Sequence, residues 1–517
     1  MQISELLKGI DRIDIAGQFD GDVSTVCYNS GKCEKNSLFI AIPGFKADGH
    51  NYIENAIENG ARFIIHQSPY TPSAGVTAIQ VSDTRRVLGK VGRNFFRDPS
   101  SSLCLMGVTG TNGKTTTTYL LEAILNKAGY SVGVIGTVNY RYNEAVFPAP
   151  NTTPESFELQ RILREMADHG VTHCIAEVSS HAIDLHRVDE CSFSIGIFTN
   201  LTHDHLDYHL TMENYFQTKK RLFSELLPSA AKNNPQKTKL DYNMIINGDD
   251  PWGQRLLTET TGKTIAYGLD ASCDLTAESY RFSLEGIAAT IRFKNKKTDI
   301  VSPLIGKFNL YNILAAVAAA TSLGISTETI GSFLAGTPRV PGRMEKVSDP
   351  GEPYVFVDYA HTDDALRRVL ENLIEFKKRK IITVFGCGGN RDRGKRPLMG
   401  EAAAQYSDLT IITSDNPRME DPLEIIEEIE KGINLPKLLP DQDYLGNLKQ
   451  KYFLVIPDRA EAILKAITAA QNGDIVLIAG KGHEDYQIIG EKRFPFDDRI
   501  VARDALKNRM KNMENFA

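Results

Sequence analysis

A glycine-rich stretch that runs into a lysine and a threonine, TGTNGKTTT at residues 109–117, has the residue types of a phosphate-binding loop. It lies between an apolar run typical of a buried strand and an amphipathic run typical of a helix. Backbone N–H groups of the turn would face a phosphate, Lys114 would reach the β- and γ-phosphates, and Thr115 would offer a hydroxyl to Mg²⁺. The strict pattern has glycine where this chain has Val108, so the loop is a variant. The alternative is a glycine-rich turn with an exposed lysine, which the strand–turn–helix order disfavours.

A second lysine occupies a position where the helical pattern expects an apolar residue. Residues 211–227, TMENYFQTKKRLFSELL, have the periodicity of an amphipathic helix with Thr211 as its N-cap. Lys219 falls in the middle of the apolar stripe of this helix. A desolvated lysine has a lowered pKa and reacts as the free amine. The alternative is that the stem packs while the charged head reaches water.

Two further segments place histidines and carboxylates just after apolar runs. FTNLTHDHLDYH ends at residue 209 and contains His205, and AEVSSHAIDLHR ends at residue 187 and contains Glu177. Strand ends beside a phosphate loop are where Mg²⁺ ligands and substrate contacts gather. A zinc site is the alternative, but cysteine ligands are missing and the spacing fits no zinc template.

The stretch TSDNPR, residues 413–418, follows the apolar run DLTIIT. Pro417 fixes its own φ and biases Asn416 away from helix, so the chain must turn there. Arg418 is therefore expected on a loop just past the C-terminal end of a strand, where ligands bind in open α/β sheets. A solvated surface arginine is the alternative.

Strand-like and helix-like runs alternate along the whole chain, which predicts an α/β protein. At roughly 100–200 residues per domain, 517 residues predict about three domains. We place them at 1–99, a smaller N-terminal α/β domain; 100–337, a central P-loop domain with a parallel sheet covered by helices; and 338–517, a Rossmann-like domain. FRDPSSS at 96–102 is expected to be a linker, and LAGTPRVPGRME at 334–345 marks the second boundary.

Composition argues against several other classes of protein. The hydrophobic fraction of 42% and net charge of -6 are those of an ordinary soluble chain without the basic field that favours nucleic acid. Seven cysteines are scattered without a C-x-x-C pair, so no disulfide framework is indicated. No signal peptide and no run of the ~18 apolar residues of a membrane span is recognised, so we expect a cytoplasmic protein that binds neither membrane nor nucleic acid.

Ten motifs together resemble the Mur ligase family, and within it most closely the MurE type, the tripeptide synthetases. Besides the phosphate loop, they are NTTP, EVSSHAIDLHR, TNLTHDHLDYH, GKFNLYN, PGRME, VDYAHTDDAL, GGNRDRGKRPLM, SDNPR and GKGHEDYQ, in the family's order over essentially the whole chain. The resemblance implies an N-terminal UDP-substrate-binding domain, a central P-loop ATPase and a C-terminal domain that binds the amino acid. It also implies peptidoglycan precursor synthesis by an ATP-dependent, ADP-forming ligase that adds an amino acid to UDP-MurNAc-L-Ala-D-Glu through an acyl phosphate. We expect the enzyme to be a monomer.

The resemblance also assigns residues to ATP and metal. Lys114, Glu177, His205 and Lys219 would be catalytic, and Thr115, Glu177, His205 and carbamylated Lys219 would hold Mg²⁺. A carbamate needs the free amine, which gives a reason for a lysine on an apolar face. ATP would contact Gly110, Thr111, Asn112, Gly113, Lys114, Thr115, Thr116, Asn309, Asn312, Arg343, Asp358 and His361.

The remaining assignments concern the two other substrates. The UDP-substrate would meet Ser30, Asn151, Thr152, Thr153, Ser179 and Arg187. Here the family's usual Asp-Ser-Arg is Asn29-Ser30-Gly31 and its Gly-Asp-Leu-Phe is NSLF, which puts the uridine contacts beside Ser30 in doubt. The amino acid would meet Arg391, Asp415, Asn416, Arg418, Gly480 and Glu484. DNPR resembles the members that add meso-diaminopimelate, whose distal carboxylate suits an arginine.

Several alternatives stay open at this point. A ligase of the same type that adds L-lysine, another Mur ligase, or a folylpolyglutamate synthetase would share the phosphate loop and the carbamylated lysine. A P-loop switch or motor protein, or a binding protein that keeps the fold without catalysis, belongs to a different class. Lys114, Glu177, His205 and Lys219 are all present, which argues against a non-catalytic protein.

Overall fold

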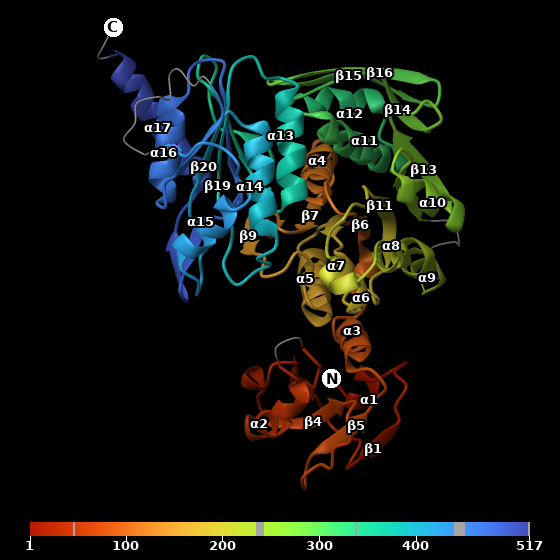
Figure 1. The fold of residues 1–517 in the computed structure, drawn as a ribbon. Helices are drawn as coiled ribbons and strands as arrows, with labels where there is room; N and C mark the ends of the chain where they lie inside the picture. Colours follow the sequence, from red (N-terminus) through yellow and green to blue (C-terminus); the bar gives the residue numbers. More distant parts are fainter. Residues whose placement is uncertain (45–46, 234–241, 337–338, 439–449, 515–517) are drawn as a thin grey trace. The chain divides into compact units, whose positions relative to one another are not determined.

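The computed structural model describes residues 1–44, 47–233, 242–336, 339–438 and 450–514 (Figure 1). Its contacts divide the chain into two compact units. Unit 1 contains Met1–Thr276, Arg292–Lys296 and Tyr311–Ile330, and unit 2 contains Ala277–Ile291, Lys297–Leu310 and Gly331–Ala517.

The N-terminal part of unit 1 is a five-stranded sheet in the order β1-β5-β4-β3-β2. All neighbours are parallel except the antiparallel pair β1 and β5. Ile and Val side chains of the strands and of helix α3 form its core. The strands are β1 (Asp14–Ala16), β2 (Val26–Cys27), β3 (Ser37–Ile40), β4 (Ala61–His66) and β5 (Thr77–Gln80); the helices are α1 (Ile3–Leu6), α2 (Ile53–Glu58) and α3 (Thr84–Phe95), with 3₁₀ turns η1 (Ser30–Lys32), η2 (Gly49–Tyr52) and η3 (Pro99–Ser102).

The central part of unit 1 is built on a parallel sheet in the order β13-β12-β11-β6-β10-β7, with the antiparallel strands β8 and β9 at one side. The inner strands β12, β11, β6 and β10, and β7 next to them, are almost wholly buried, as expected for a parallel sheet with helices on its faces. The strands are β6 (Cys104–Thr109), β7 (Val132–Ile135), β8 (Asn139–Tyr142), β9 (Ala145–Pro148), β10 (His173–Glu177), β11 (Phe193–Phe198), β12 (Asn243–Asn247) and β13 (Lys263–Gly268).

The helices of this part follow the strands in the chain. They are α4 (Lys114–Lys127), α5 (Ser156–Asp168), α6 (Ser180–Asp184), α7 (Leu206–His209), α8 (Met212–Arg221), α9 (Leu227–Asn233) and α10 (Pro251–Glu259), with the π-helical turn η4 (Leu222–Leu226) between α8 and α9. Beyond β13 the chain continues into elements that are divided between the two units: β14 (Leu275–Ser283), β15 (Gly286–Phe293), β16 (Lys296–Ser302), α11 (Lys307–Ser322) and α12 (Thr327–Leu334).

Unit 2 contains a six-stranded sheet in the order β17-β18-β22-β19-β20-β21, parallel except for β17. One face packs on α13, α14 and α15 and the other on α16 and α17, with a separate apolar core on each face (Figure 1). The strands are β17 (Glu345–Lys346), β18 (Tyr354–Asp358), β19 (Ile381–Phe385), β20 (Leu409–Ile412), β21 (Tyr452–Val455) and β22 (Ile475–Ala479), with the hairpin β23 (Tyr486–Ile489) and β24 (Lys492–Pro495); the helices are α13 (Asp363–Ile374), α14 (Lys395–Tyr406), α15 (Pro422–Glu430), α16 (Arg459–Ala469) and α17 (Asp498–Glu514).

The predicted fold class is confirmed: each of the three regions has its own α/β sheet and core. The antiparallel strands β8 and β9, and the strands β14–β16, were not foreseen. The expected linker at 96–102 contains the turn η3, in which Pro99 and Ser100 are buried. The domain limits 1–99, 100–337 and 338–517 stay a prediction, and the boundary between 337 and 338 lies outside the described residues. No helix in the described ranges is long and apolar enough to cross a membrane.

Helix α8, which carries Lys219, begins where the sequence predicts. The Thr211 hydroxyl accepts a hydrogen bond from the Asn214 N–H at 3.1 Å and caps α8. Directly after Arg221 the helix widens into η4, and single π-helical turns occur frequently at functional sites.

Replacement of this cap tests how much α8 depends on it. Thr211→Ala removes the acceptor for an orphan N–H and should lower the free energy of unfolding by ~1 kcal/mol. Thr218→Ala is the matched control on the same helix; its hydroxyl bonds back to the Asn214 carbonyl, and its loss should change stability by less than about 0.5 kcal/mol. Urea unfolding measures both, and equal effects would contradict the cap.

Candidate active site

The strand order of the central sheet brings three chain segments to the phosphate loop. β6 lies between β10 and β11, and all three run parallel, with Val108 opposite Glu177 and Thr109 opposite Phe198. The loop after β6, Glu177 at the end of β10, and the residues that follow Phe198 therefore meet at one edge of the sheet.

The phosphate loop is held in a strained, closely packed form. Gly113 has φ 87°, and a Cβ there would lie 2.3 Å from Oδ1 of Asn312 on α11. The Nζ of Lys114 donates to the carbonyls of Gly110 at 2.9 Å and Thr111 at 2.8 Å. The only residue type that fits at 113 is glycine, and the Lys114 ammonium is held over the loop that would receive a phosphate.

Glu177 is buried and makes hydrogen bonds to two threonines. Thr115 Oγ1 donates to Glu177 Oε2 at 3.2 Å, and Thr137 donates through its N–H at 3.0 Å and its hydroxyl at 2.9 Å. A carboxylate beside the P-loop threonine hydroxyl is a set of hard oxygen donors, which is the chemistry that Mg²⁺ prefers. These residues therefore fit the predicted metal.

Lys219 is buried to the tip of its side chain, with 1% of the residue exposed. Its Nζ donates to the Gly110 carbonyl at 3.0 Å and lies 4.7 Å from the centre of the Tyr215 ring. Burial, and after it the charge of Lys114, lower the pKa of Lys219 well below its usual value. The side chain does not snorkel to water, so the first interpretation, a desolvated amine, fits the structure.

His205 lies on the loop after β11 in a left-handed backbone conformation, with φ 54°. About half of its side chain is exposed, and its Nε2 is 3.6 Å from Asp204 Oδ2. Burial, against which Asp204 acts, lowers the pKa of His205, and the charges of Lys114 and Lys219 lower it further. In the described part of the chain, no three His, Cys, Asp or Glu side chains are grouped so that they could hold a metal ion. The role of His205 as a ligand stays a prediction.

Five of the six residues predicted to bind the UDP-substrate come together beside Glu177. The hydroxyl of Thr153 donates to the Glu177 carbonyl at 2.8 Å and accepts from the Ser179 N–H at 3.2 Å. Arg187 donates to the Thr153 carbonyl at 3.1 Å. The group is completed by two residues of the same turn: the Asn151 carbonyl accepts from the Tyr140 hydroxyl, and the Thr152 hydroxyl lies 3.1 Å from that of Thr137.

Ser30 belongs to the turn η1 in the N-terminal sheet and not to that hydrogen-bonded group. Asn29 caps the turn by accepting from the Gly31 N–H at 3.0 Å, so the departure from the family's Asp-Ser-Arg keeps a cap at this position. Next to it, burial, followed by the charges of Glu158 and Glu155, raises the pKa of Tyr28 to about 12.

The other residues predicted for ATP belong to unit 2. Arg343 stacks on Tyr359, with its Cζ 4.6 Å from the ring centre, and the His361 ring lies 4.6 Å from the same tyrosine. Asp358 is buried, accepts from the N–H groups of Met344 and Ala360, and has its pKa raised by burial. Asn309 donates to the Ile305 carbonyl at 2.8 Å. Contact of these four residues with ATP stays a prediction.

The residues predicted to bind the amino acid lie at the ends of neighbouring strands of unit 2. Asn416 donates to Glu484 at 2.8 Å, and a Cβ at Gly480 would lie 2.8 Å from Asp415 Oδ2. The fully buried Lys481 lies 3.4 Å from Glu484 and 3.9 Å from Asp415. Burial, then the charge of Asp415, raise the pKa of Glu484. Two carboxylates facing one lysine leave a site that suits a further cation.

Both predicted arginines of this region are on loops. Arg418, with φ 53°, is half-buried and donates from Nη1 to the Gly389 carbonyl at 2.9 Å. Its N–H donates to the Ile488 carbonyl at 3.1 Å, so the loop is tied to the β23 hairpin. Arg391 is exposed on the loop after β19. The structure brings both arginines to the edge of the sheet where Asp415 and Gly480 lie.

Three functional neighbours were not found from the sequence. Thr137 contacts Glu177, Tyr359 packs between Arg343 and His361, and Lys481 faces the two carboxylates. Each one directly follows or nearly follows an apolar run, in IGT, VDYAH and IAGKG. Position just past a buried strand was the available signal.

Three family descriptions match the chain in succession. They are the Mur ligase family, catalytic domain, at residues 22–96; the Mur ligase middle domain, at residues 108–320; and the Mur ligase, glutamate ligase domain, at residues 342–482.

Full-length relatives agree with these matches. The chain is 44% identical to the UDP-N-acetylmuramoyl-L-alanyl-D-glutamate–2,6-diaminopimelate ligase of Geobacter metallireducens over 501 residues, covering 96% of this chain and 97% of the relative. Its identity to the ligase of the same name from Geobacter sulfurreducens is 44% over 511 residues, covering 98% and 99%. A solved structure of a ligase with this name has a TM-score of 0.68 at 32% identity and covers 99% of both chains. The folylpolyglutamate synthase of Mycobacterium tuberculosis, with a TM-score of 0.58 at 16% identity, covers 76% of this chain and 91% of its own and shares the fold.

Replacement of Lys219 by a neutral side chain of similar length tests its burial. Because the folded-state pKa is lowered, the cost of burying the amine is greatest below that pKa and vanishes as pH rises to the unfolded value of about 10.4. Lys219→Met should therefore be more stable than the wild type at pH 7 in CO₂-free buffer. The difference between their free energies of unfolding should narrow by up to about 1.4 kcal/mol per pH unit as the pH rises to 10.

Urea unfolding between pH 7 and pH 10 measures this gap. Lys220→Met is the control, because the neighbouring Lys220 pairs with Glu259 at the surface. A wild type more stable than Lys219→Met at pH 7, or a gap that does not change with pH, would contradict the buried amine.

Proposed function

The chain belongs to the Mur ligase family, and from that premise we propose that it adds meso-diaminopimelate to UDP-MurNAc-L-Ala-D-Glu in an ATP-dependent, ADP-forming reaction. The observation that carries the ligase assignment is the desolvated Lys219 amine against the Gly110 carbonyl of the phosphate loop. A switch or motor protein has no use for a buried reactive lysine at this place. Identity of 44% over nearly the full length to relatives named as diaminopimelate ligases supports the choice of substrate.

The chemistry follows from the poor reactivity of a carboxylate toward an amine. A carboxylate oxygen of the UDP-substrate attacks the γ-phosphorus of ATP, the bond to the β-phosphate oxygen breaks, and ADP leaves. The amine of the amino acid, as the free base, then attacks the acyl carbon, and phosphate departs as the amide forms and the amine loses a proton. Negative charge builds up in both steps, and the Lys114 ammonium is positioned to stabilise it.

Mg²⁺ is the metal proposed for this site. Thr115 and Glu177 would hold one ion, and His205 with Lys219 as a carbamate would hold a second. When bound, Mg²⁺ neutralises charge on the phosphates. The buried environment of Lys219 prepares its amine for reaction with CO₂, because carbamate formation requires the unprotonated form.

The three predicted domains would divide the substrates among them. Residues 1–99 would bind the UDP moiety through the Ser30 loop, 100–337 would bind ATP and the dipeptide end beside Thr153 and Arg187, and 338–517 would bind the amino acid. Arg343, Asp358, His361 and Asn309 would contact ATP. We propose that the enzyme acts as a monomer in the cytoplasm.

The choice of meso-diaminopimelate rests on the charges of unit 2. This amino acid and L-lysine carry amines at similar distances, but diaminopimelate has a second carboxylate beside its distal amine. Arg418 and Arg391 would bind that carboxylate. Asp415 and Glu484 would pair with the distal ammonium, because the single charge of Lys481 does not balance their two carboxylates. L-lysine would leave Arg418 unpaired in a half-buried position.

Turnover with defined substrates tests the proposal directly. ADP and phosphate should form only when UDP-MurNAc-L-Ala-D-Glu and meso-diaminopimelate are both present with ATP and Mg²⁺. Lys114→Ala should remove at least about 10³-fold of this activity while the fold stays intact, because it removes the charge that faces the transferred phosphoryl group. Hydrolysis of ATP without either substrate, at the rate of the full reaction, would contradict a ligase.

Arg418 is expected to decide between the two amino acids. The wild type should prefer meso-diaminopimelate to L-lysine by at least about 10²-fold in kcat/KM, since a lost charged pair is worth a few kcal/mol. Arg418→Ala should lose most of this preference while the KM values for ATP and the UDP-substrate change little. Arg368→Ala, which removes a surface arginine paired with Asp364, is the control. Equal use of L-lysine by the wild type would overturn the substrate assignment and favour a lysine-adding ligase.

A further inference from the structure

Two loops of unit 2 approach each other with almost no side chains between them. Loop A, residues 386–394, follows β19 and carries Arg391; loop B, residues 413–421, follows β20 and carries Arg418. A Cβ at Gly389 would lie 1.9 Å from the Pro417 carbonyl oxygen, and one at Gly388 would lie 2.9 Å from Nη1 of Arg418. Backbone therefore packs on backbone, and a small shift of either loop moves the other.

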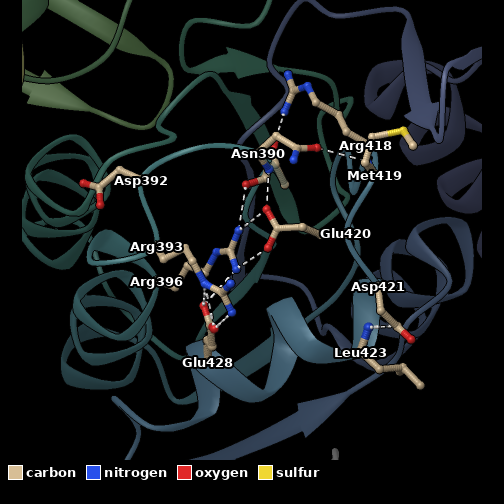
Figure 2. Close-up of polar contacts among 12 residues, drawn as sticks. Asn390, Asp392, Arg393, Arg396, Arg418, Met419, Glu420, Asp421, Leu423 and Glu428 are labelled. Atoms are coloured by element: carbon tan, nitrogen blue, oxygen red, sulfur yellow. Dashed lines mark hydrogen bonds and ion pairs between the residues drawn. The ribbon is translucent and has the colours of Figure 1, made fainter.

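A buried arginine, Arg396, holds loop B to helix α14, the helix that follows loop A. Arg396, at the start of α14, is completely inaccessible to solvent. Its guanidinium forms a two-point pair with Glu420 of loop B, at 2.9 and 3.0 Å, and a further bond to Glu428 of α15 at 2.8 Å (Figure 2). It also reaches the Gly388 carbonyl at 3.5 Å. Arg396 thus contacts both loops and α15.

Glu420 passes this restraint on to the residues around Arg418. The oxygen of Glu420 that faces Arg396 Nη2 also accepts the backbone N–H of Asn390 in loop A, and the Asn390 side chain accepts the N–H of Met419 at 3.0 Å (Figure 2). Arg418 then donates from its guanidinium to the Gly389 carbonyl at 2.9 Å. Hydrogen bonds and the adjoining backbone therefore connect Arg396, through Glu420 and Asn390, to Arg418, the arginine proposed to bind the substrate. We call this set of contacts the circuit.

Backbone strain is located on this circuit. Asn390 and Arg418 both have left-handed conformations, with φ 52° and 53°. Residues other than glycine persist in this region where the surrounding structure over-determines them, and such residues cluster at ligand clamps. The conformation that aims the Arg418 side chain therefore depends on contacts outside residue 418 itself.

The four charged side chains behind the two loops balance one another without any ligand. Arg396 and Arg393 face Glu420 and Glu428, two cations against two carboxylates, and Arg393 pairs with Glu428. The group formed by Asp415, Glu484 and Lys481 is not balanced in this way, because its two carboxylates face one cation. The balanced cluster has no net charge with which to bind a substrate. It does hold in place the two loops that carry Arg391 and Arg418.

From this geometry we propose that Arg396 and Glu420 are positioning residues that determine specificity for meso-diaminopimelate by fixing the orientation of Arg418 toward its distal carboxylate. The inference rests on the proposed function of Arg418. Neither residue touches the substrate; each acts through loop A and loop B. ATP and the UDP-substrate bind through other loops, so their use is not controlled by this circuit.

Glu420→Gln is the sharpest test, because it keeps the size of the side chain and removes its charge. The amide keeps only one acceptor oxygen, so an N–H group of the buried Arg396 meets an NH₂ donor and the two-point ion pair that anchors loop B is lost. The KM for meso-diaminopimelate should rise about ten- to hundredfold, as expected for a misplacement of a positioning contact. The KM values for ATP and the UDP-substrate should stay within about twofold.

A double-mutant cycle separates positioning from general damage. If Glu420 acts through Arg418, Arg418→Ala combined with Glu420→Gln should be no worse for meso-diaminopimelate than Arg418→Ala alone. Additive losses, or a similar rise in KM for all three substrates, would overturn the inference in favour of a structural role. An unchanged KM for meso-diaminopimelate in Glu420→Gln would overturn it as well.

Two further variants complete the design. Arg393→Gln is the matched control: it removes an exposed partner of the same Glu428 but leaves the Arg396–Glu420 pair intact, so the KM for meso-diaminopimelate should change less than about twofold. If thermal unfolding shows that Glu420→Gln does not fold, Glu420→Asp replaces it, because it keeps the charge with a shorter reach. Glu420→Asp should raise the KM for meso-diaminopimelate less than Glu420→Gln, but still more than the KM values for the other substrates. A wild type that does not use meso-diaminopimelate refutes the proposed function instead, which is a separate outcome.

Discussion

One carbonyl oxygen, that of Gly110, receives hydrogen bonds from two lysines, Lys114 at 2.9 Å and Lys219 at 3.0 Å. Burial, and after it the charge of Lys114 on the same acceptor, lower the pKa of Lys219 well below its usual value. The central site is therefore built to receive negative charge. A phosphate would satisfy Lys114, and conversion of the Lys219 amine to an anion would remove the repulsion altogether.

The same constraint accounts for the surrounding structure. Lys219 reaches the loop because α8 begins at the Thr211 cap and packs its apolar face, with Tyr215, into the core, which Phe223 of η4 continues. Glu177 is near because β10 is the neighbour of β6, and it is fixed from two sides by Thr115 and Thr137. Substitution at the apolar face of α8 would thus affect chemistry through the position of a single nitrogen atom.

The sequence was informative where function and local pattern coincide. Thr211, Lys219 and the phosphate loop could be placed because helical periodicity and strand–turn–helix order are local signals. Thr137, Tyr359, Lys481 and Glu420 could not, since each acquires its role from a partner that the fold brings close. Glu177 lies 40 residues from Thr137, Arg343 lies 16 from Tyr359, Asp415 lies 66 from Lys481, and Arg396 lies 24 from Glu420. The strands β8, β9 and β14–β16 were missed for a related reason: none is a continuous apolar run, and β8 and β15 alternate buried with partly exposed residues, which is a weaker signal than the apolar runs of parallel strands.

Three residues other than glycine take left-handed conformations at predicted functional positions. His205, Asn390 and Arg418 each take this conformation directly after or near the end of a parallel strand, with φ between 52° and 54°. Such a conformation costs about 1–3 kcal/mol, so a sequence selected for stability alone would place glycine there. Glycine has no side chain that can bind a metal ion, accept an N–H or pair with a carboxylate. At these three positions the side chain offers chemistry that glycine lacks, and under the proposed function the contacts that hold Arg418, such as the Arg396–Glu420 pair, would belong to the functional site.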